Sequence, residues 1–377
     1  MVGCTTLKCG CINADFMVVH PEVLDGLLRI LVSRKGSDLH VKVGVPPRIR
    51  VKGLLSEIGG IPPATAVLVQ ELVRKSIPAE MWDEFLHSKQ ADYAYQSHDG
   101  NRFRVNAFFQ RGNISIAFRL VASSPASIEE LYLPEVVSAL ANERRGLILV
   151  TGPTGSGKSS TLAAMVQRIN ETRSAHIITI EDPIETLHSD ICSLINQREV
   201  GFDVTTFLDA IRAAMREDPD VILIGEMRDE ETVRAAISAA ETGHLVLSTL
   251  HTLNAKETVS RIIDFFPSHQ HQQIRSSLAG SLRGVICQRL VRVNDSSLRP
   301  VLEVMVANGR IIQCILEPSK GSEIPVIIKE GEYYGMRTFE RSLFDLIESG
   351  LISSSEAMLS ATSPQDLQVM LQRSGLV

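Results

Sequence analysis

The sequence predicts an α/β protein in which a small α+β domain precedes a larger domain with a parallel sheet and a C-terminal helical region. Three observations favour this class. Segments between residues 38 and 120 alternate polar and apolar side chains, as strands with one buried face do. From Gly146 onward, short apolar strands alternate with helical segments, which is typical of a parallel sheet covered on both faces. Residues 152–159 read Gly-Pro-Thr-Gly-Ser-Gly-Lys-Ser, a complete phosphate-binding loop.

The composition is that of a globular protein long enough for two hydrophobic cores. The chain has 377 residues, of which 44% are hydrophobic and 22% are charged. Its formal net charge of −6 argues against nucleic acid as the main partner, because surfaces that bind nucleic acid are basic. No apolar stretch approaches the roughly 18 residues of a membrane span, and the N-terminus does not resemble a signal peptide, so we expect a cytoplasmic protein.

Residues 18–122 are predicted to form the first domain. Apolar residues recur there first at helical spacing and then in alternation, with Pro and Gly residues between the segments. The expected elements are, in order, a helix over 23–32, strands over 38–43 and 48–51, helices over 68–73 and 81–86, and a hairpin of 102–108 with 115–120.

Residues 123–145 are predicted to form a linker and the first helix of the second domain. The segment 123–126 is rich in Ser and Pro, as linkers often are. Ser127 and Glu130 have the spacing of a capping box, which is expected to begin the helix.

Residues 146–377 are predicted to form the second domain. Its expected strands are 147–150, 177–180, 221–224 and 245–248, each short and predominantly apolar. Beyond about Asp264 the chain is expected to be mostly helical, including 282–290 and 339–348, with a hairpin between 300–306 and 324–328.

Residues 1–17 are predicted to be an unstructured tail, or the product of a misassigned start codon. A metal clip made by its cysteines is conceivable, although no second cluster with zinc spacing follows (Cys4, Cys9 and Cys11). The other cysteines stand among apolar neighbours and are expected to be small core residues in a reducing compartment (Cys192, Cys287 and Cys314).

The phosphate-binding loop lies between an apolar strand and a helical segment, which is the order that the motif requires. Its glycines let backbone N–H groups close around phosphates, Lys158 supplies a point charge, and the Ser159 hydroxyl can ligate Mg²⁺. The sequence therefore predicts binding of ATP with Mg²⁺ by the loop residues Gly152, Pro153, Thr154, Gly155, Ser156, Gly157, Lys158, Ser159 and Ser160.

A carboxylate is expected near the γ-phosphate, where it orients the attacking water. The strand 221–224 ends in Gly225-Glu226 at the place where such a group should stand, so Glu226 is the predicted catalytic carboxylate. The usual motif has an aspartate directly after the apolar run, so Gly225 makes this version atypical. The alternative is that Glu226 only forms an ion pair with Arg228.

Two further clusters follow apolar strands, where ligands gather in open α/β sheets. Glu181, Asp182 and Glu185 supply more carboxylates than a helix cap requires. His251 follows the strand 245–248, where it could contact the γ-phosphate, and His244 precedes the same strand. A single histidine beside a strand is more often a core residue, and for His244 both interpretations stay open.

Together these residues resemble the secretion ATPase superfamily and, within it, the type IV pilus retraction ATPases of the PilT family. The resemblance covers about residues 22–350. It rests on GPTGSGKSSTLAAM (152–165), ITIEDPIE (178–185), INQREVG (195–201), AIRAAMREDPDVILIGEMRD (210–229), AAETGHLVLSTLHT (239–252), GSDLHVKVGVPPRIRVKG (36–53), RFRVNAF (102–108) and YYGMRTFERSL (333–343).

The resemblance implies a PAS-like N-terminal domain and a RecA-like P-loop NTPase domain in a hexameric ring, in which ATP hydrolysis rotates one domain against the other. It implies that Glu226 activates water and that His251 senses the nucleotide. The carboxylates of Glu181 and Glu185 are implied to assist at the metal. Ser159, Glu181 and Glu226 are the implied metal ligands.

Arginines of the first domain are implied to reach the phosphates, and by position these are Arg104, Arg111 and Arg119. A fork-shaped cation is suited to the charge that spreads over a transferring phosphoryl group. The alternative is that Arg102 and Arg104 form only the solvated face of an amphipathic strand.

The resemblance implies a motor for pilus retraction, serving twitching motility or DNA uptake, at the inner face of the cell membrane. The implied partners are further copies of the chain, an inner-membrane platform protein and a paralogous pilus ATPase. One segment departs from the family pattern: retraction ATPases commonly carry Ala-Ile-Arg-Asn-Leu-Ile-Arg-Glu, and residues 310–317 have apolar residues at both arginine positions. A pilus or pseudopilus assembly motor, a weakly hydrolysing accessory ring subunit and a nucleic-acid translocase therefore stay open as alternatives.

Overall fold

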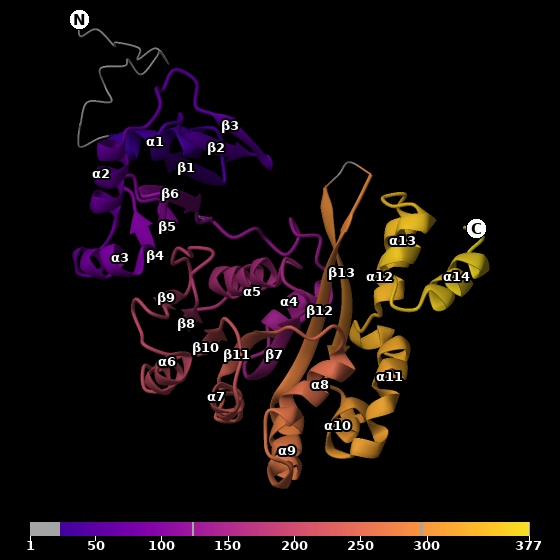
Figure 1. Cartoon of the computed structure of the whole chain (residues 1–377). Helices are drawn as coiled ribbons and strands as arrows, with labels where there is room; N and C mark the ends of the chain where they lie inside the picture. Colours follow the sequence, from indigo (N-terminus) through magenta and orange to yellow (C-terminus); the bar gives the residue numbers. More distant parts are fainter. Residues whose placement is uncertain (1–22, 123, 295–296, 377) are drawn as a thin grey trace, which may run out of the picture. The chain divides into compact units, whose positions relative to one another are not determined.

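The computed structural model describes residues 23–122, 124–294 and 297–376. The chain divides into two units, Met1–Ser123 and Ser124–Val377, each with its own sheet (Figure 1). The predicted tail of residues 1–17, with Cys4, Cys9 and Cys11, lies outside the described residues. None of the helices within the described ranges is long and apolar enough to cross a membrane.

The N-terminal unit is a six-stranded antiparallel sheet with the order β3-β2-β1-β6-β5-β4. Its core joins the apolar faces of the helices to alternate residues of the strands, such as Leu39, Val105 and Phe118. The elements are α1 (Val23–Ser33), β1 (Asp38–Lys42), β2 (Arg48–Val51), β3 (Leu54–Glu57), α2 (Ala66–Ser76), η2 (Ala79–Met81), α3 (Trp82–Ser88), β4 (Gln90–Gln96), β5 (Arg102–Gln110) and β6 (Asn113–Leu120).

The elements predicted for this unit are present, and the structure adds β3 and β4. All four residues of β3 are exposed, so this strand lacks the alternation that would have indicated it. In β4 only Ala91 and Tyr93 are buried, and the polar residues Gln90, Asp92 and Gln96 are exposed.

The C-terminal unit is built on a seven-stranded sheet with the order β13-β12-β7-β11-β10-β8-β9. Only β13 is antiparallel to its neighbour. The elements of the sheet and its covering helices are α4 (Glu135–Ala141), β7 (Gly146–Thr151), α5 (Lys158–Thr172), β8 (His176–Glu181), β9 (Leu194–Glu199), α6 (Phe207–Ala214), β10 (Val221–Ile224), α7 (Glu230–Glu241), β11 (Leu245–Leu250), α8 (Ala255–Asp264), η3 (Ser268–Gln270), α9 (His271–Ser281), β12 (Leu282–Arg292) and β13 (Leu298–Val306).

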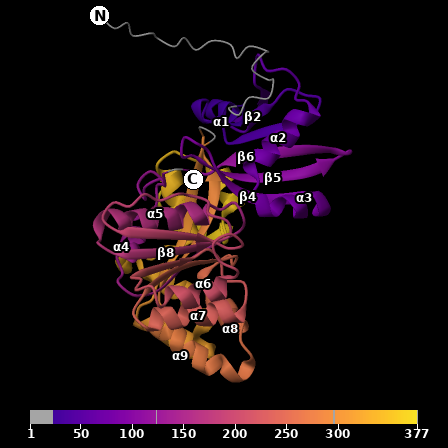
Figure 2. The same cartoon turned by 90° about the vertical axis from the view of Figure 1, so that its left-hand side faces the viewer.

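Helices cover both faces of this sheet, which explains why β7, β10 and β11 are buried along their whole length. On one face α4 and α5 pack against alternate residues of the strands, and on the other α6, α7, α8 and α9 do so (Figure 2). Further helices complete the unit: α10 (Gly309–Leu316), η4 (Pro318–Glu323), α11 (Ile324–Glu330), η5 (Glu332–Tyr334), α12 (Phe339–Glu348), α13 (Ser354–Ser360) and α14 (Pro364–Arg373). The predicted fold class is confirmed.

Two predictions for the C-terminal unit are wrong. Residues 282–290, predicted to be helical, form the strand β12, which pairs with β7 on one side and β13 on the other. A short, buried apolar run that includes Val285 and Ile286 has the same pattern in a helix and in a central strand, and here the sheet supplies both neighbours. Residues 324–328, predicted as a strand, form α11, whose first turn contains Pro325.

Two smaller expectations also need correction. The capping box forms, since Ser127 N donates to Glu130 Oε2 at 2.9 Å and Glu130 N to Ser127 Oγ at 3.1 Å. It closes a single turn that ends at Tyr132, where φ is +56°, and the first helix begins only at Glu135. Cys192 is exposed and not a core residue, whereas Cys287 and Cys314 are buried as predicted.

The segment that departs from the family pattern forms α10. The two positions at which retraction ATPases commonly have arginine are Ile312 and Leu316, and both pack, partly buried, against the hydrophobic core. The apolar replacements are therefore part of the packing of this helix and do not present a charged surface.

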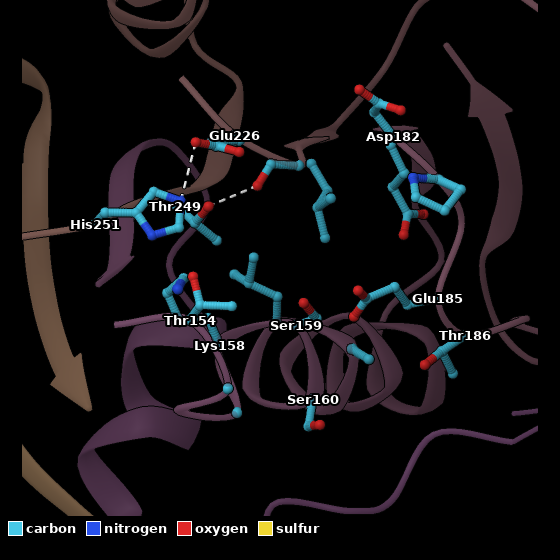
Figure 3. Close-up of a pocket in the computed structure, with 18 of the residues that line it drawn as sticks. Thr154, Lys158, Ser159, Ser160, Asp182, Glu185, Thr186, Glu226, Thr249 and His251 are labelled. Carbon is cyan, nitrogen blue, oxygen red and sulfur yellow. Dashed lines mark hydrogen bonds and ion pairs between the residues drawn. The ribbon is translucent and has the colours of Figure 1, made fainter. Parts of the chain in front are cut away.

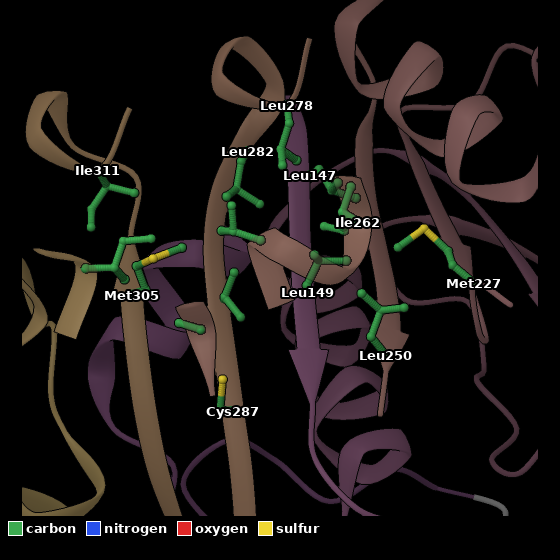
Figure 4. Close-up of a cluster of buried hydrophobic side chains, with 14 of the residues drawn as sticks. Leu147, Leu149, Met227, Leu250, Ile262, Leu278, Leu282, Cys287, Met305 and Ile311 are labelled. Atoms are coloured by element: carbon green, nitrogen blue, oxygen red, sulfur yellow. The ribbon is translucent and has the colours of Figure 1, made fainter. Parts of the chain in front are cut away.

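Leu278 packs fully buried between the sheet and its covering helices (Figure 4). Because truncation leaves a cavity in this core, we expect Leu278→Ala to lower the free energy of unfolding by about 2–5 kcal/mol. The matched control is Leu359→Ala, whose side chain is 89% exposed and whose loss should change stability by no more than about 0.5 kcal/mol. Urea unfolding followed by circular dichroism measures both, and equal effects would contradict this account of the core.

Candidate active site

A cavity of about 500 Å³ lies at the carboxyl ends of the parallel strands of the C-terminal unit (Figure 3). Polar residues that directly follow β7, β8, β10 and β11 meet there, because these four strands are neighbours in the sheet. The lining includes Thr154, Gly155, Gly157, Lys158, Ser159 and Ser160 of the loop, together with Glu181, Asp182, Glu185, Thr186, His188, Gly225, Glu226, Arg228, Thr249 and His251.

The phosphate-binding loop connects β7 directly to α5. Gly152, Gly155 and Gly157 have φ values of +144°, +78° and +86°, which favour glycine strongly. Lys158 Nζ donates to the carbonyl oxygens of Gly152 and Pro153 at 2.8 and 3.1 Å. Burial lowers the pKa of Lys158, while the carboxylates of Glu226 and Glu185 act in the opposite direction. A cationic side chain and the N-terminus of α5 thus face the same cavity, as anion binding requires.

Glu226 stands between two basic side chains. Its Oε1 lies 3.0 Å from Nε2 of His251, and its Oε2 accepts a hydrogen bond from Nε of Arg228 at 2.9 Å. The ion pair with Arg228 that was the alternative is therefore present, and Glu226 also lines the cavity. With 23% of its side chain exposed, the carboxylate is held in one orientation and still has access to a bound molecule.

Gly225 lets the end of β10 come close to the end of β8. The Gly225 N–H donates to the carbonyl of Ile180 at 2.8 Å, and a Cβ atom at Gly225 would lie only 3.3 Å from that oxygen. From the other side, Thr249 Oγ1 donates to the carbonyl of Gly225 at 2.7 Å. The atypical glycine is thus explained by the close approach of β10 and β8 at this edge.

Glu181 is the most buried of the acidic residues after β8. Burial raises its pKa, although hydrogen bonds from Thr179 Oγ1 at 2.7 Å and Gln197 Nε2 at 3.2 Å oppose this shift. Asp182 and Glu185 line the cavity too, so the structure brings together all three predicted carboxylates of this cluster.

Sequence reasoning missed two residues of this region. Gln197 of β9 donates to Glu181 and to the carbonyl of Thr186, and it accepts a hydrogen bond from the His188 N–H at 2.9 Å. His188 lines the cavity, and burial lowers its pKa to about 4, so it is neutral at pH 7. Gln197 lies within the segment INQREVG, which indicates only the family resemblance, and nothing in the sequence singles out His188.

His244, for which two interpretations were open, lies outside the cavity lining. Its Nδ1 lies 2.9 Å from the carbonyl oxygen of Ala239 and 3.2 Å from Thr242 Oγ1, at the end of the preceding helix. These local contacts favour the structural interpretation.

Arg104 and Arg119 belong to the N-terminal unit. They lie opposite each other on β5 and β6 and are exposed on the same face of the sheet. Arg119 Nε donates to Asp38 Oδ1 at 2.8 Å. Burial raises the pKa of Asp38, but hydrogen bonds from Arg119 and Ser37 outweigh it, so this pKa lies below its ordinary value. Contact of either arginine with a phosphate stays a prediction.

The donor atoms of the cavity fit a magnesium ion that binds together with phosphates. The Ser159 hydroxyl and the carboxylates of Glu181 and Glu226 line it from three different elements. Such hard oxygen donors suit Mg²⁺, which proteins usually hold through one or two carboxylates and the substrate phosphates. Within the described ranges, no group of three or more His, Cys, Asp or Glu residues could hold a metal by itself.

Comparison with known proteins agrees with these observations. The family model of type II/IV secretion system proteins matches residues 21–337. The type IV pilus retraction ATPase PilT of Pseudomonas aeruginosa is 42% identical over 340 residues, which cover 90% of this chain and 98% of that protein. The type IV pilus ATPase PilU of the same organism is 37% identical, with 92% and 90% covered. A crystal structure of the pilus retraction motor PilT with bound ADP is similar at a TM-score of 0.84, with 38% identity over 93% of this chain and 99% of that one.

Proposed function

Because the chain belongs to the type II/IV secretion system protein family, we propose that it is an ATP-hydrolysing motor that powers the retraction of type IV pili. The resemblance to the retraction ATPases is confirmed at 42% identity over most of the chain. The observation that carries the proposal is the convergence of a complete phosphate-binding loop and Glu226 on one cavity. An assembly motor or an accessory ring subunit would share the fold but differ in action or in rate.

In the proposed reaction the loop N–H groups and Lys158 hold the β and γ phosphates of ATP. Glu226 orients a water molecule toward the γ-phosphorus and accepts its proton as the bond to the leaving ADP oxygen breaks. His251 and Arg228 hold the two oxygens of this carboxylate, so its orientation is fixed before the nucleotide arrives. His251 directly follows β11 and lines the cavity, where it would sense whether a γ-phosphate is present.

The remaining roles follow from the same cavity. Ser159, Glu181 and Glu226 would hold Mg²⁺, with Glu185 assisting, and the ion would supply positive charge at the phosphates. Arg104 and Arg119 would supply further charge at the transferring phosphoryl group.

We propose that the motor is a homohexameric ring at the inner face of the cell membrane, at the pilus base. The proposed partners are an inner-membrane platform protein and a paralogous ATPase, since P. aeruginosa has both PilT and PilU relatives of this chain. The acidic net charge of −6 gives no support to a nucleic-acid translocase.

Retraction and assembly predict opposite phenotypes. If the chain is a retraction motor, deleting its gene leaves surface pili abundant and abolishes twitching, whereas deleting an assembly motor removes the pili. Electron microscopy of fibres on the deletion strain measures this. Complementation with the intact gene and with its Glu226→Gln variant is the control, and only the intact gene should restore twitching.

A deletion strain without surface pili would instead favour the assembly motor. The altered α10 segment, with Ile312 and Leu316 at the two arginine positions, is the observation that makes this second candidate worth testing.

A further inference from the structure

Gln288 is a polar residue in the interior of the C-terminal unit. It lies in β12, directly after the buried run Val285-Ile286-Cys287, and is 3% exposed. β12 pairs with β7 in parallel, with Cys287 opposite Thr151, the last residue of β7. Gln288 therefore comes next to Gly152, at the point where the phosphate-binding loop begins.

The side-chain amide of Gln288 forms one hydrogen bond with the loop and another with the helix that follows. Nε2 donates to the carbonyl of Ser156 at 2.7 Å, and Oε1 accepts a hydrogen bond from Thr161 Oγ1 at 2.7 Å. Thr161, in the first turns of α5, is fully buried, so neither hydrogen bond competes freely with water. One amide thus fixes the loop against the helix whose N-terminus faces the cavity.

Two loop glycines lie so close to Gln288 that a side chain at either position would collide with it. A Cβ atom at Gly152 would lie 2.2 Å from the carbonyl oxygen of Gln288, and one at Gly157 would lie 2.8 Å from its Nε2. Both positions also have positive φ, so only glycine lets the loop backbone pack directly against Gln288.

From this geometry we propose that Gln288 is a positioning residue for the nucleotide. It is not a catalytic residue, because it sets the loop conformation in which the backbone N–H groups face the phosphates and acts on the phosphates only through that loop. This inference rests on the proposed function of the cavity as an ATP site. The competing explanation is that Gln288 merely satisfies buried polar groups, in which case its loss would affect stability alone.

The test compares Gln288→Leu, Thr161→Val and their double variant in the purified full-length chain. Isothermal titration measures the dissociation constant for ADP, and thermal unfolding without nucleotide measures stability. We expect Gln288→Leu to raise the ADP dissociation constant and KM for ATP about tenfold while kcat stays within about twofold, because ground state and transition state lose the same phosphate contacts. Thr161→Val should raise the dissociation constant by a smaller factor, and the double variant should show less than the product of the two effects.

The matched control is Ser342→Ala. Ser342 is buried and its Oγ accepts a hydrogen bond from the Leu302 N–H, so its loss removes a buried hydrogen bond of β13 away from the loop. This variant should unfold at a lower temperature and bind ADP as the wild type does.

Wild-type affinity for ADP in Gln288→Leu, with a lowered unfolding temperature, would overturn the positioning role. If Gln288→Leu does not fold, the nearly isosteric Thr161→Val decides, and an unchanged dissociation constant there overturns the inference as well. A wild-type chain that binds no ADP would overturn the proposed function itself, which is a different result.

Discussion

Replacing Glu226 with glutamine is expected to lower kcat for ATP hydrolysis by about 10² to 10⁴, the range that loss of a general base gives. Glutamine has the same shape and keeps an oxygen that can accept a hydrogen bond from Arg228 or His251. It cannot take up the proton of the attacking water. The affinity for ADP should stay within about threefold, because Glu226 acts after the phosphates are held.

The experiment measures phosphate release by wild type and Glu226→Gln, with light scattering on the same samples to read the oligomeric state. Glu231→Gln is the matched control, since this exposed glutamate of α7 lies outside the cavity lining and its loss should leave the rate unchanged. Comparable rates in wild type and Glu226→Gln would remove Glu226 from catalysis. Inactivity of the wild type as well would favour the accessory ring subunit.

The part of the fold that the sequence predicts well is the part with strong local patterns. β7, β10 and β11 are wholly buried, so each contains consecutive apolar residues, as the central strands of a parallel sheet do. β12 also contains an apolar run, Val285-Ile286-Cys287, but it follows a helix directly, and only pairing with β7 and β13 makes it a strand. A short window of sequence does not show which strands pair. For the same reason, a short apolar segment such as α11 cannot be assigned as helix or strand from its own residues.

The site shows the same division. An apolar strand ends at or directly before each of the loop, Glu181, Glu226 and His251. Because parallel strands end at one edge of the sheet, the sequence predicts that these residues lie close together. Gln197 and Gln288 act from β9 and β12, whose places beside β8 and β7 depend on the order of strands in the sheet. Their hydrogen bonds to Glu181 and Ser156 join residues that are far apart in the chain, and a single sequence gives no signal for them.

Arg104→Ala is expected to lower kcat by about 10³ to 10⁵ while nucleotide affinity is largely kept, as loss of an arginine finger does. The guanidinium fork can spread its charge over the oxygens of the transferring γ-phosphoryl group, and this interaction matters most in the transition state. Arg104 is exposed, so its loss should leave the free energy of unfolding nearly unchanged. Arg104→Lys keeps the charge without the fork and should recover only part of the rate.

The matched control is Arg102→Ala, on the same strand and at a position that faces the same side as Arg104. It should keep the wild-type rate within about twofold if Arg104 acts as a finger and not as part of a solvated face. An unchanged rate in Arg104→Ala together with a large loss in Arg119→Ala would assign the finger to Arg119. Nε of Arg119 already donates a hydrogen bond to Asp38, so Arg119 would reach a phosphate only with its two terminal guanidinium nitrogens. Unchanged rates in both variants would show that this sheet face is solvated and takes no part in hydrolysis.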